Sequence, residues 1–165
     1  MRPHACLCAA VTLVPTRTRV LVLRHAAERH KPSSTARLAA LALPGCRLVD
    51  YGDGPLPELD LADTWLLYPD GASAAARPPP AQLLVLDGTW QQARRMLYRI
   101  PELRALPRLT LPAHTPLPHL RRQPRAGAMS TLEAIARALA LLEGDAIAAP
   151  LEKLLDQLVS SARRA

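Results

Sequence analysis

Two short stretches of the sequence bring an aspartate, a threonine and a tryptophan close together. One is Asp63-Thr64-Trp65 and the other is Asp87-Gly88-Thr89-Trp90. At either place the carboxylate has the chemistry to take a proton or to hold a cationic group, and the indole can stack on a base. The position of each aspartate relative to its neighbouring strand decides which of the two faces a ligand.

Apolar runs of strand length alternate with helical patterns along the chain. Strands are expected at 19–25, 46–51, 64–69, 83–88 and 108–112. Helices are expected at 33–43, 89–100, 130–144 and 149–165, with a further turn at 101–106. The expected helix caps are Ser33 or Ser34, Thr89 with Gln92, and Ser130 with Glu133. The alternation predicts an α/β fold with a mostly parallel sheet and helices on both faces.

Parallel sheets bind ligands at the carboxyl ends of their strands. Asp87 ends a strand and so belongs to that edge, whereas Asp63 precedes its strand and is expected at the opposite edge as a look-alike. A structural role competes for Asp87, because an acid near a helix N-terminus is favoured by the helix dipole. Gly88 allows close approach of a ligand or a positive φ, and Trp90 suits packing as well as stacking.

The positive charge of the chain favours a polyanionic partner. Lys and Arg number 21 against 14 Asp and Glu, which gives a net charge of +7. A solvated basic face is the alternative reading. The arginines that could contact phosphates follow the Asp87 turn or lie in a later Pro-rich loop, namely Arg94, Arg95, Arg99, Arg104, Arg121, Arg122 and Arg125.

Other chemical signatures are weak. His25 and Glu28 follow the first strand as an acid and base might, although a solitary surface histidine is commoner. No Rossmann, P-loop, HExxH or GxSxG motif is present. Three cysteines give no disulfide framework and suit a reducing cytoplasm, and no apolar run is long enough to span a bilayer.

Four stretches together resemble the DTW-domain family. They are "LDGTWQQARRML" with its Asp-any-Thr-Trp box, "VLRHAAERHKPSSTARLAALAL", "LLYP" and "LRRQPRAGAMSTLEAIARALALLE". The likeness runs from about residue 2 to 143, and we treat residues 1–165 as a single DTW domain. The family is similar to tRNA-uridine aminocarboxypropyltransferases, which move the 3-amino-3-carboxypropyl group of S-adenosylmethionine to N3 of a tRNA uridine and release 5′-methylthioadenosine.

The resemblance implies a SPOUT-like fold whose C-terminal knot forms the S-adenosylmethionine site. It makes tRNA the partner of the enzyme. The oligomeric state stays open between the dimer that the SPOUT analogy suggests and a monomer, which is slightly favoured. The cysteine content and the short apolar runs already favour the cytoplasm and no membrane partner. Asp87 becomes the catalytic residue, either as the base for N3 or as a group that orients the cofactor. The cofactor-side residues are Leu67, Tyr68, Pro69, Gly88, Thr89, Trp90, Ser130, Thr131 and Glu133. The RNA-binding residues are His25, Arg37, Arg94, Arg95, Arg121 and Arg122.

The chain departs from the family pattern in three places. Many relatives carry an earlier cysteine pair that would hold zinc together with Cys6 and Cys8. Two alternatives stay open: either residues 1–10 are a remnant of a zinc-binding segment and zinc is not expected, or the start codon is misplaced and an upstream cysteine pair completes the site. His25-Ala26 stands where the family has His-Pro, and Ser34 where it often has Asn. Two other functions stay open, namely a SPOUT-type RNA methyltransferase and a basic RNA-binding module without chemistry.

Overall fold

A computed structural model describes residues 11–31, 34–56, 58–70, 78–112 and 129–164. The strands are β1 (Arg19–His25), β2 (Cys46–Tyr51), β3 (Thr64–Leu67), β4 (Gln82–Asp87) and β5 (Arg108–Leu109). The helices are the 3-10 turn η3 (Ala26–Glu28), α1 (Ala36–Ala42), α2 (Trp90–Arg99), α3 (Pro101–Arg104), α4 (Thr131–Glu143) and α5 (Asp145–Arg164).

The five strands form one sheet in the order β2-β1-β4-β3-β5. Every neighbouring pair is parallel, which confirms the expected sheet. β1 and β4 lie near the middle, and their register pairs Arg24 with Asp87 at the carboxyl edge. Successive side chains of a strand point to opposite faces, so the apolar runs of β1 and β4 supply two cores at once.

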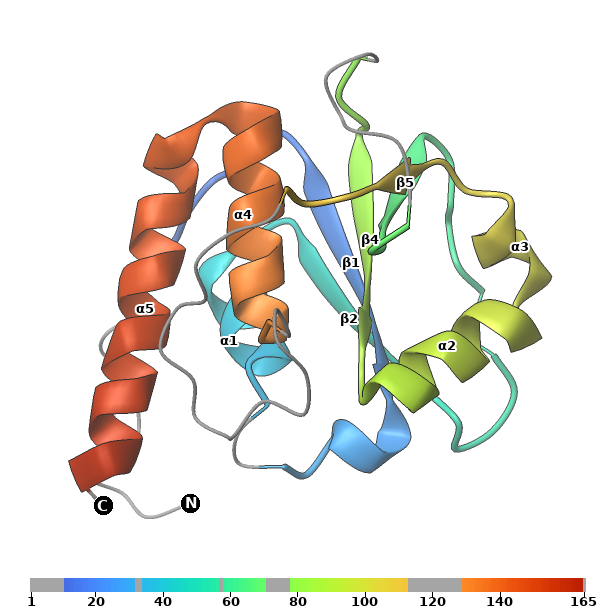
Figure 1. Cartoon of the computed structure of the whole chain (residues 1–165), viewed down its shortest axis with the longest axis horizontal. Coiled ribbons are helices and arrows are strands. Elements are labelled where there is room, and N and C mark those ends of the chain that lie inside the picture. Colours follow the sequence, from blue (N-terminus) through green and yellow to red (C-terminus); the bar gives the residue numbers. More distant parts are fainter. Residues whose placement is uncertain (1–10, 32–33, 57, 71–77, 113–128, 165) are drawn as a thin grey trace.

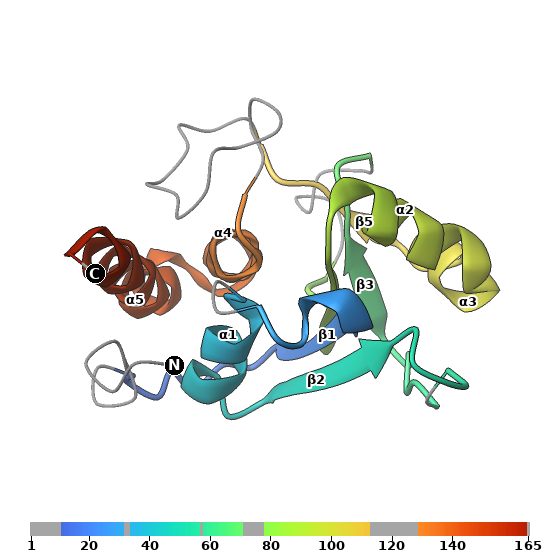
Figure 2. The same ribbon diagram turned by 90° about the horizontal axis from the view of Figure 1, so that it is seen from below.

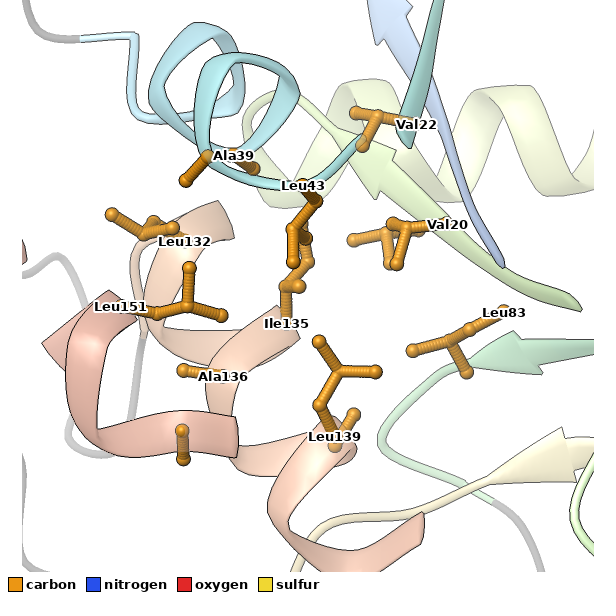
Figure 3. Packing of buried hydrophobic residues seen from close by; sticks show 14 of the residues in the cluster. Val20, Val22, Ala39, Leu43, Leu83, Leu132, Ile135, Ala136, Leu139 and Leu151 are labelled. Carbon is orange, nitrogen blue, oxygen red and sulfur yellow. The ribbon is translucent and has the colours of Figure 1, made fainter. Parts of the chain in front are cut away.

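Helices cover both faces of the sheet, as the sequence predicted (Figures 1 and 2). On one face, Val20 of β1 and Leu83 of β4 pack with Ile135 and Leu139 of α4 and Leu151 of α5 (Figure 3). On the other face the alternate strand residues pack against α2 and α3. That second cluster includes Leu21, Leu23, Leu84, Met96 and Leu103. Burying each of these side chains contributes about 1.5–3 kcal/mol to folding.

Several element boundaries differ from those expected. Helix α1 begins at Ala36 with Thr35 as its N-cap, so the Ser34 cap is wrong, and Ser33 lies outside the described residues. The Thr35 hydroxyl instead accepts the Leu132 N–H at 3.2 Å, which ties α1 to the start of α4. β3 ends at Leu67 and β5 covers two residues only. Helix α5 begins at Asp145 and continues through Pro150.

The caps nearest the carboxyl edge agree with the sequence. Thr89 and Gln92 form the predicted capping box of α2. Ser130 accepts the Glu133 N–H at 3.2 Å and caps α4. The implied C-terminal knot stays a prediction, because residues 113–128 between β5 and α4 lie outside the described part. Within the described ranges, no helix has the length and apolar character needed to cross a membrane.

Candidate active site at the carboxyl edge of the sheet

Five elements meet at the carboxyl edge of the sheet, near its middle. β1 and β4 end side by side, η3 and α2 begin directly after them, and the amino end of α4 lies at the same edge (Figure 1). This follows from the parallel order, because all the strands present their carboxyl ends together. Asp87 stands at the centre of this edge, as the last residue of β4.

The two carboxylate oxygens of Asp87 have different surroundings. The residue is 7% exposed. Its Oδ1 accepts a hydrogen bond from Oγ1 of Thr131 at 2.5 Å, across from the first turn of α4. Its Oδ2 is buried and has no hydrogen-bond partner among the residues that the structure describes. An unsatisfied buried carboxylate oxygen is costly, so Oδ2 marks a position where a donor from a ligand would be favourable.

The surroundings of Asp87 raise its pKa above the ordinary value for an aspartate. Burial is the main cause, because it disfavours the charged form, and the nearby charge of Glu28 adds to it. The hydrogen bond from Thr131 and the charges of Arg24 and Lys31 act in the opposite direction. A carboxylate with a raised pKa is a stronger base, which suits a group that must remove a proton.

Gly88 lies in tight packing at the end of β4. A Cβ at this position would lie 3.0 Å from Oε1 of Gln92 and 3.5 Å from Cβ of His25. Gln92 belongs to the capping box, in which Oε1 accepts the Thr89 N–H at 2.6 Å. A side chain at residue 88 would therefore disturb the start of α2, and the close approach that glycine permits is to the protein itself.

Trp90 and Tyr68 join the carboxyl edge to the α2 face. Their rings stack with centroids 5.6 Å apart and planes 24° apart. Tyr68 is the buried ring of this pair, whereas Trp90 is 44% exposed. Arg108 of β5 places its guanidinium 5.3 Å from the centre of the Tyr68 ring, and it also forms an ion pair with Asp70. Trp90 thus packs with one ring and still presents much of its surface to solvent.

A groove of about 510 Å³ runs from this stack along α2. It is lined by Tyr68, Pro69, Asp70, Trp90, Arg94, Leu97, Tyr98, Arg104 and Arg108. The structure therefore brings Tyr68, Pro69 and Trp90, expected on the cofactor side, together with Arg94, expected to bind RNA. Tyr98 and Arg108 were missed from the sequence, although Trp90, Arg94 and Tyr98 recur every four residues, which places them on one helix face.

An ion-pair network fixes the segment that follows β1. Arg24 is 6% exposed and donates to both oxygens of Asp50, at 2.7 and 3.2 Å. Arg29 bonds the same carboxylate at 2.9 Å and Asp53 at 3.1 Å. The hydrogen bond from Arg24 lowers the pKa of Asp50, although burial acts against it. Arg24 thus anchors β1 beside Asp87 and does not face the ligand side as a free cation.

His25 has a local structural role. Its Nδ1 accepts the Ala27 N–H at 3.2 Å, which caps η3, and its ring lies 6.4 Å from that of Tyr51. Glu28 pairs with Lys31, so the structure does not join His25 and Glu28 as an acid–base pair. His25 stays half-buried at the carboxyl edge, where its predicted RNA contact is untested.

The other residues predicted to bind the cofactor or RNA lie in several parts of the fold. Leu67 ends β3, and Ser130 and Thr131 begin α4, so these three lie at the carboxyl edge. Glu133 is 1% exposed and pairs with Arg137 at 3.2 Å. Arg37 and Arg95 are exposed on α1 and α2. The predicted phosphate contacts Arg121, Arg122 and Arg125 lie outside the described residues, as do Cys6 and Cys8.

Asp63 lies at the opposite edge, as expected. It immediately precedes β3, and its carboxylate accepts the Ala81 N–H at 3.0 Å. Its backbone carbonyl accepts the Gln82 N–H at 3.1 Å, which starts the pairing of β3 with β4. The described ranges hold no group of three or more His, Cys, Asp and Glu side chains placed to bind a metal ion.

Comparison with known proteins gives a consistent result. The DTW domain matches residues 1–163. The chain is 31% identical over 156 residues to tRNA-uridine aminocarboxypropyltransferase 2 of Drosophila melanogaster, which covers 84% of this chain and 62% of the relative. It is 31% identical to the protein of that name from Macaca fascicularis, covering 86% and 54% of the two chains.

The tRNA-uridine aminocarboxypropyltransferase A of Arabidopsis thaliana is 29% identical, with 87% and 71% covered. The chain thus spans between half and two thirds of the length of the animal relatives and somewhat more of the plant one. No solved structure matches it. Because the domain match covers nearly the whole sequence, the chain belongs to the DTW-domain family.

Proposed function

We propose that this chain transfers the 3-amino-3-carboxypropyl group of S-adenosylmethionine to N3 of a uridine in tRNA. The observation that carries the proposal is Asp87, a buried carboxylate at the ligand edge with one oxygen held by Thr131 and the other without a partner among the described residues. The names of the animal and plant relatives support the same reaction. The net charge of +7 suits a tRNA substrate.

The residues at the carboxyl edge fit an S-adenosylmethionine site. The unpartnered Oδ2 of Asp87 would accept an N–H or O–H from a ligand, and the end of β3 and the start of α4 flank it. We assign Leu67, Thr89 and Ser130 to the walls of this site, in the SPOUT-like arrangement that a C-terminal knot would complete. When bound, S-adenosylmethionine supplies the electrophilic carbon next to its sulfonium, and 5′-methylthioadenosine leaves with the electron pair of the broken carbon–sulfur bond.

Asp87 would act as the base. N3 of uridine carries a proton and is a poor nucleophile until that proton is removed. Oδ2 would take the proton, while Thr131 keeps Oδ1 fixed, so that the carboxylate presents one oxygen in one direction. The raised pKa of Asp87 makes this transfer more favourable than it would be for a solvated aspartate. Holding both reactants at this edge would supply much of the rate through orientation.

The tRNA would bind through cations around the edge. Arg94 and Arg95 are exposed on α2, beside the Asp87 turn, and Arg37 is exposed on α1. We assign phosphate contacts to these three, to Arg121 and Arg122, and a ribose or phosphate contact to His25. Such contacts position the RNA without reading its sequence and make binding depend on salt.

Product analysis tests the function. The purified chain is incubated with bulk tRNA and S-adenosylmethionine, and the small products are separated chromatographically. Release of 5′-methylthioadenosine, with a matching mass increase on uridine, supports the proposal. S-adenosylhomocysteine would identify a methyltransferase instead, and tRNA binding with neither product would identify a binding module without chemistry. A reaction without tRNA controls for spontaneous breakdown of S-adenosylmethionine.

A further inference from the structure

Helix α2 presents a stripe of aromatic and cationic side chains that its own packing does not require. Trp90, Arg94 and Tyr98 recur at four-residue spacing and share one helix face. Tyr98 is 61% exposed, and the Arg94 guanidinium lies 5.8 Å from its ring centre. Other residues of α2, including Met96 and Leu97, bury the helix against the sheet. The stripe is therefore free to serve a ligand.

Three of the five aromatic residues of the whole chain line this single groove. They are Tyr68, Trp90 and Tyr98, in a sequence with two Trp, three Tyr and no Phe. A chain so poor in aromatic residues would gain most from placing them in its core, yet two of these three are exposed. The groove volume of about 510 Å³ is within the range of small-ligand sites, roughly 300–1,000 Å³.

The charges of the groove identify the kind of ligand. Arg94, Arg104 and Arg108 all line it. Arg108 pairs with Asp70, whereas Arg94 and Arg104 form no ion pair with any residue that the structure describes. Guanidinium groups beside exposed aromatic rings suit a nucleotide, whose base stacks while its phosphate accepts paired N–H bonds. A short single-stranded nucleic acid carries an unpaired base and a phosphate in every nucleotide, so it offers both kinds of contact along its length.

S-adenosylmethionine fits the same groove less well. Its adenine can stack, but its sulfonium and ammonium outweigh its single carboxylate, so the molecule is a net cation. The guanidiniums of Arg94 and Arg104, which have no ion-pair partner among the described residues, would repel it, whereas they attract a phosphodiester chain. The groove also starts beside the carboxyl edge, because Trp90 follows Asp87 by three residues and Tyr68 directly follows β3. A nucleotide in the groove would thus be a near neighbour of a uridine held at Asp87.

We propose that the groove binds an unpaired ribonucleotide adjacent to the target uridine, with its base against the indole of Trp90 and its phosphate on Arg94 and Arg104. This inference rests on the proposed function, because the uridine at Asp87 is what brings its neighbour into the groove. It extends that function by naming an RNA subsite on the α2 and α3 side of the sheet. Tyr98 would support the same strand one step farther from Asp87.

Tryptophan fluorescence provides a direct readout. Trp65 is 7% exposed in the core, so a ligand in the groove would affect Trp90 selectively. The full chain is titrated with a single-stranded hexaribonucleotide that contains uridine, and separately with S-adenosylmethionine alone. We expect quenching by the oligonucleotide and loss of most of that signal in Trp90→Phe. Quenching by S-adenosylmethionine but not by the oligonucleotide would overturn the proposal and make the groove a cofactor site.

Two groove variants and one matched control separate specific contacts from general charge. Tyr98→Ala and Arg104→Ala change exposed side chains, so circular dichroism should be unaltered. Each should weaken oligonucleotide binding by on the order of tenfold, and Arg104→Ala should reduce the salt slope by about one. Arg47→Ala removes the same charge from β2, at the other edge of the sheet, and should bind as the wild type does. Equal effects of all three substitutions, or none, would overturn the proposal.

The outcome can be distinguished from failure of the proposed function. Oligonucleotide binding is measured without turnover, whereas the function is judged by release of 5′-methylthioadenosine. Wild-type protein that forms this product while Tyr98→Ala and Arg104→Ala bind RNA normally refutes the subsite alone. Protein that forms no such product but loses RNA affinity in those two variants refutes the transfer reaction and leaves the nucleotide-binding groove standing.

Discussion

Asp63 and Asp87 lie in similar sequence and have opposite structural roles. Asp63 precedes β3 at the amino edge of the sheet, and Asp87 ends β4 at the carboxyl edge. The carboxylate of Asp63 is exposed and accepts a backbone N–H from Ala81 at 3.0 Å. The carboxylate of Asp87 is buried and keeps one oxygen without a partner among the described residues. The two aspartates differ because one precedes its strand and the other ends its strand, and the similar residues around them do not reveal this difference.

The two tryptophans differ in the same way. Trp65 is 7% exposed and packs in the cluster under α1, α4 and α5. Trp90 is 44% exposed and stacks on Tyr68 beside the groove. Thr64 is buried and its hydroxyl accepts from Nε2 of Gln82 at 3.0 Å, whereas Thr89 caps α2. Thr64 and Trp65 therefore belong to the buried interior. Thr89 and Trp90 lie at the start of α2, where the Trp90 ring is partly exposed beside the groove.

The largest difference in stability should appear between the tryptophans. Trp65→Ala removes a buried indole and should lower the free energy of unfolding by about 3–5 kcal/mol. Trp90→Ala loses mainly one stacked pair and should cost about 1 kcal/mol. Urea unfolding followed by circular dichroism measures both. Equal losses would show that Trp90 is as much a core residue as Trp65 and would weaken its assignment to the groove.

Thr131 should matter to Asp87 as a positioning residue. Thr131→Val removes the hydroxyl that donates to Oδ1, and we expect transfer to fall about tenfold, since a hydrogen bond to a charged group is lost. The loss should also move the acidic limb of the pH–rate profile to higher pH, because the hydroxyl lowers the pKa of Asp87. Thr131→Ser keeps the donor and should restore both properties. Failure of serine to rescue would indicate that Thr131 acts through packing.

The raised pKa of Asp87 predicts a stability cost at neutral pH. A carboxyl whose folded pKa is raised binds its proton more tightly in the native state, so its contribution is favourable at acidic pH and is lost as pH rises through the folded pKa. Asp87→Asn should therefore show a higher Tm than the wild type at neutral pH, with the difference shrinking at acidic pH. Thermal unfolding across this range checks the sign, and a lower Tm at every pH would contradict it.

The smallest effect should come from Asp63. Its φ of 45° lies in the left-handed region, which aspartate tolerates better than alanine. Asp63→Ala should cost about 1 kcal/mol of folding stability and leave transfer within about twofold of the wild type. The same unfolding and transfer assays measure both quantities. A large loss of transfer in a folded Asp63→Ala protein would erase the distinction between the two edges.

Much of the fold follows directly from local patterns. The apolar runs at 19–25 and 46–51 are β1 and β2 with the expected bounds, and Thr89 with Gln92 forms the expected capping box. These features depend on neighbouring residues alone. The start of α1 does not, because the Thr35 hydroxyl bonds the Leu132 N–H, 97 residues away. The early start of α5 and its passage through Pro150 likewise depend on packing against α4.

The site divides along the same line. The position of Asp87 at the ligand edge could be predicted because the strand order fixes which end of β4 lies there. Its proposed catalytic role depended also on the resemblance to the DTW-domain family. Its bond to Thr131 could not be derived from spacing, since the two residues are 44 positions apart. The groove was also missed as a unit, because Arg108 reaches the Tyr68 ring from a different strand and only the fold brings them together. Both contacts join residues that are far apart in the sequence, so residue spacing alone could not predict them.

One paired measurement tests the role of Asp87 most directly. Single-turnover transfer is followed in Asp87→Asn and in Asp63→Asn, each with excess enzyme over tRNA. We expect the transfer rate of Asp87→Asn to fall roughly a thousandfold or more, as for removal of an essential base, with tRNA binding nearly unchanged. Asp63→Asn should transfer at a rate near that of the wild type. An active Asp87→Asn enzyme, or equal losses in the two variants, would contradict the account.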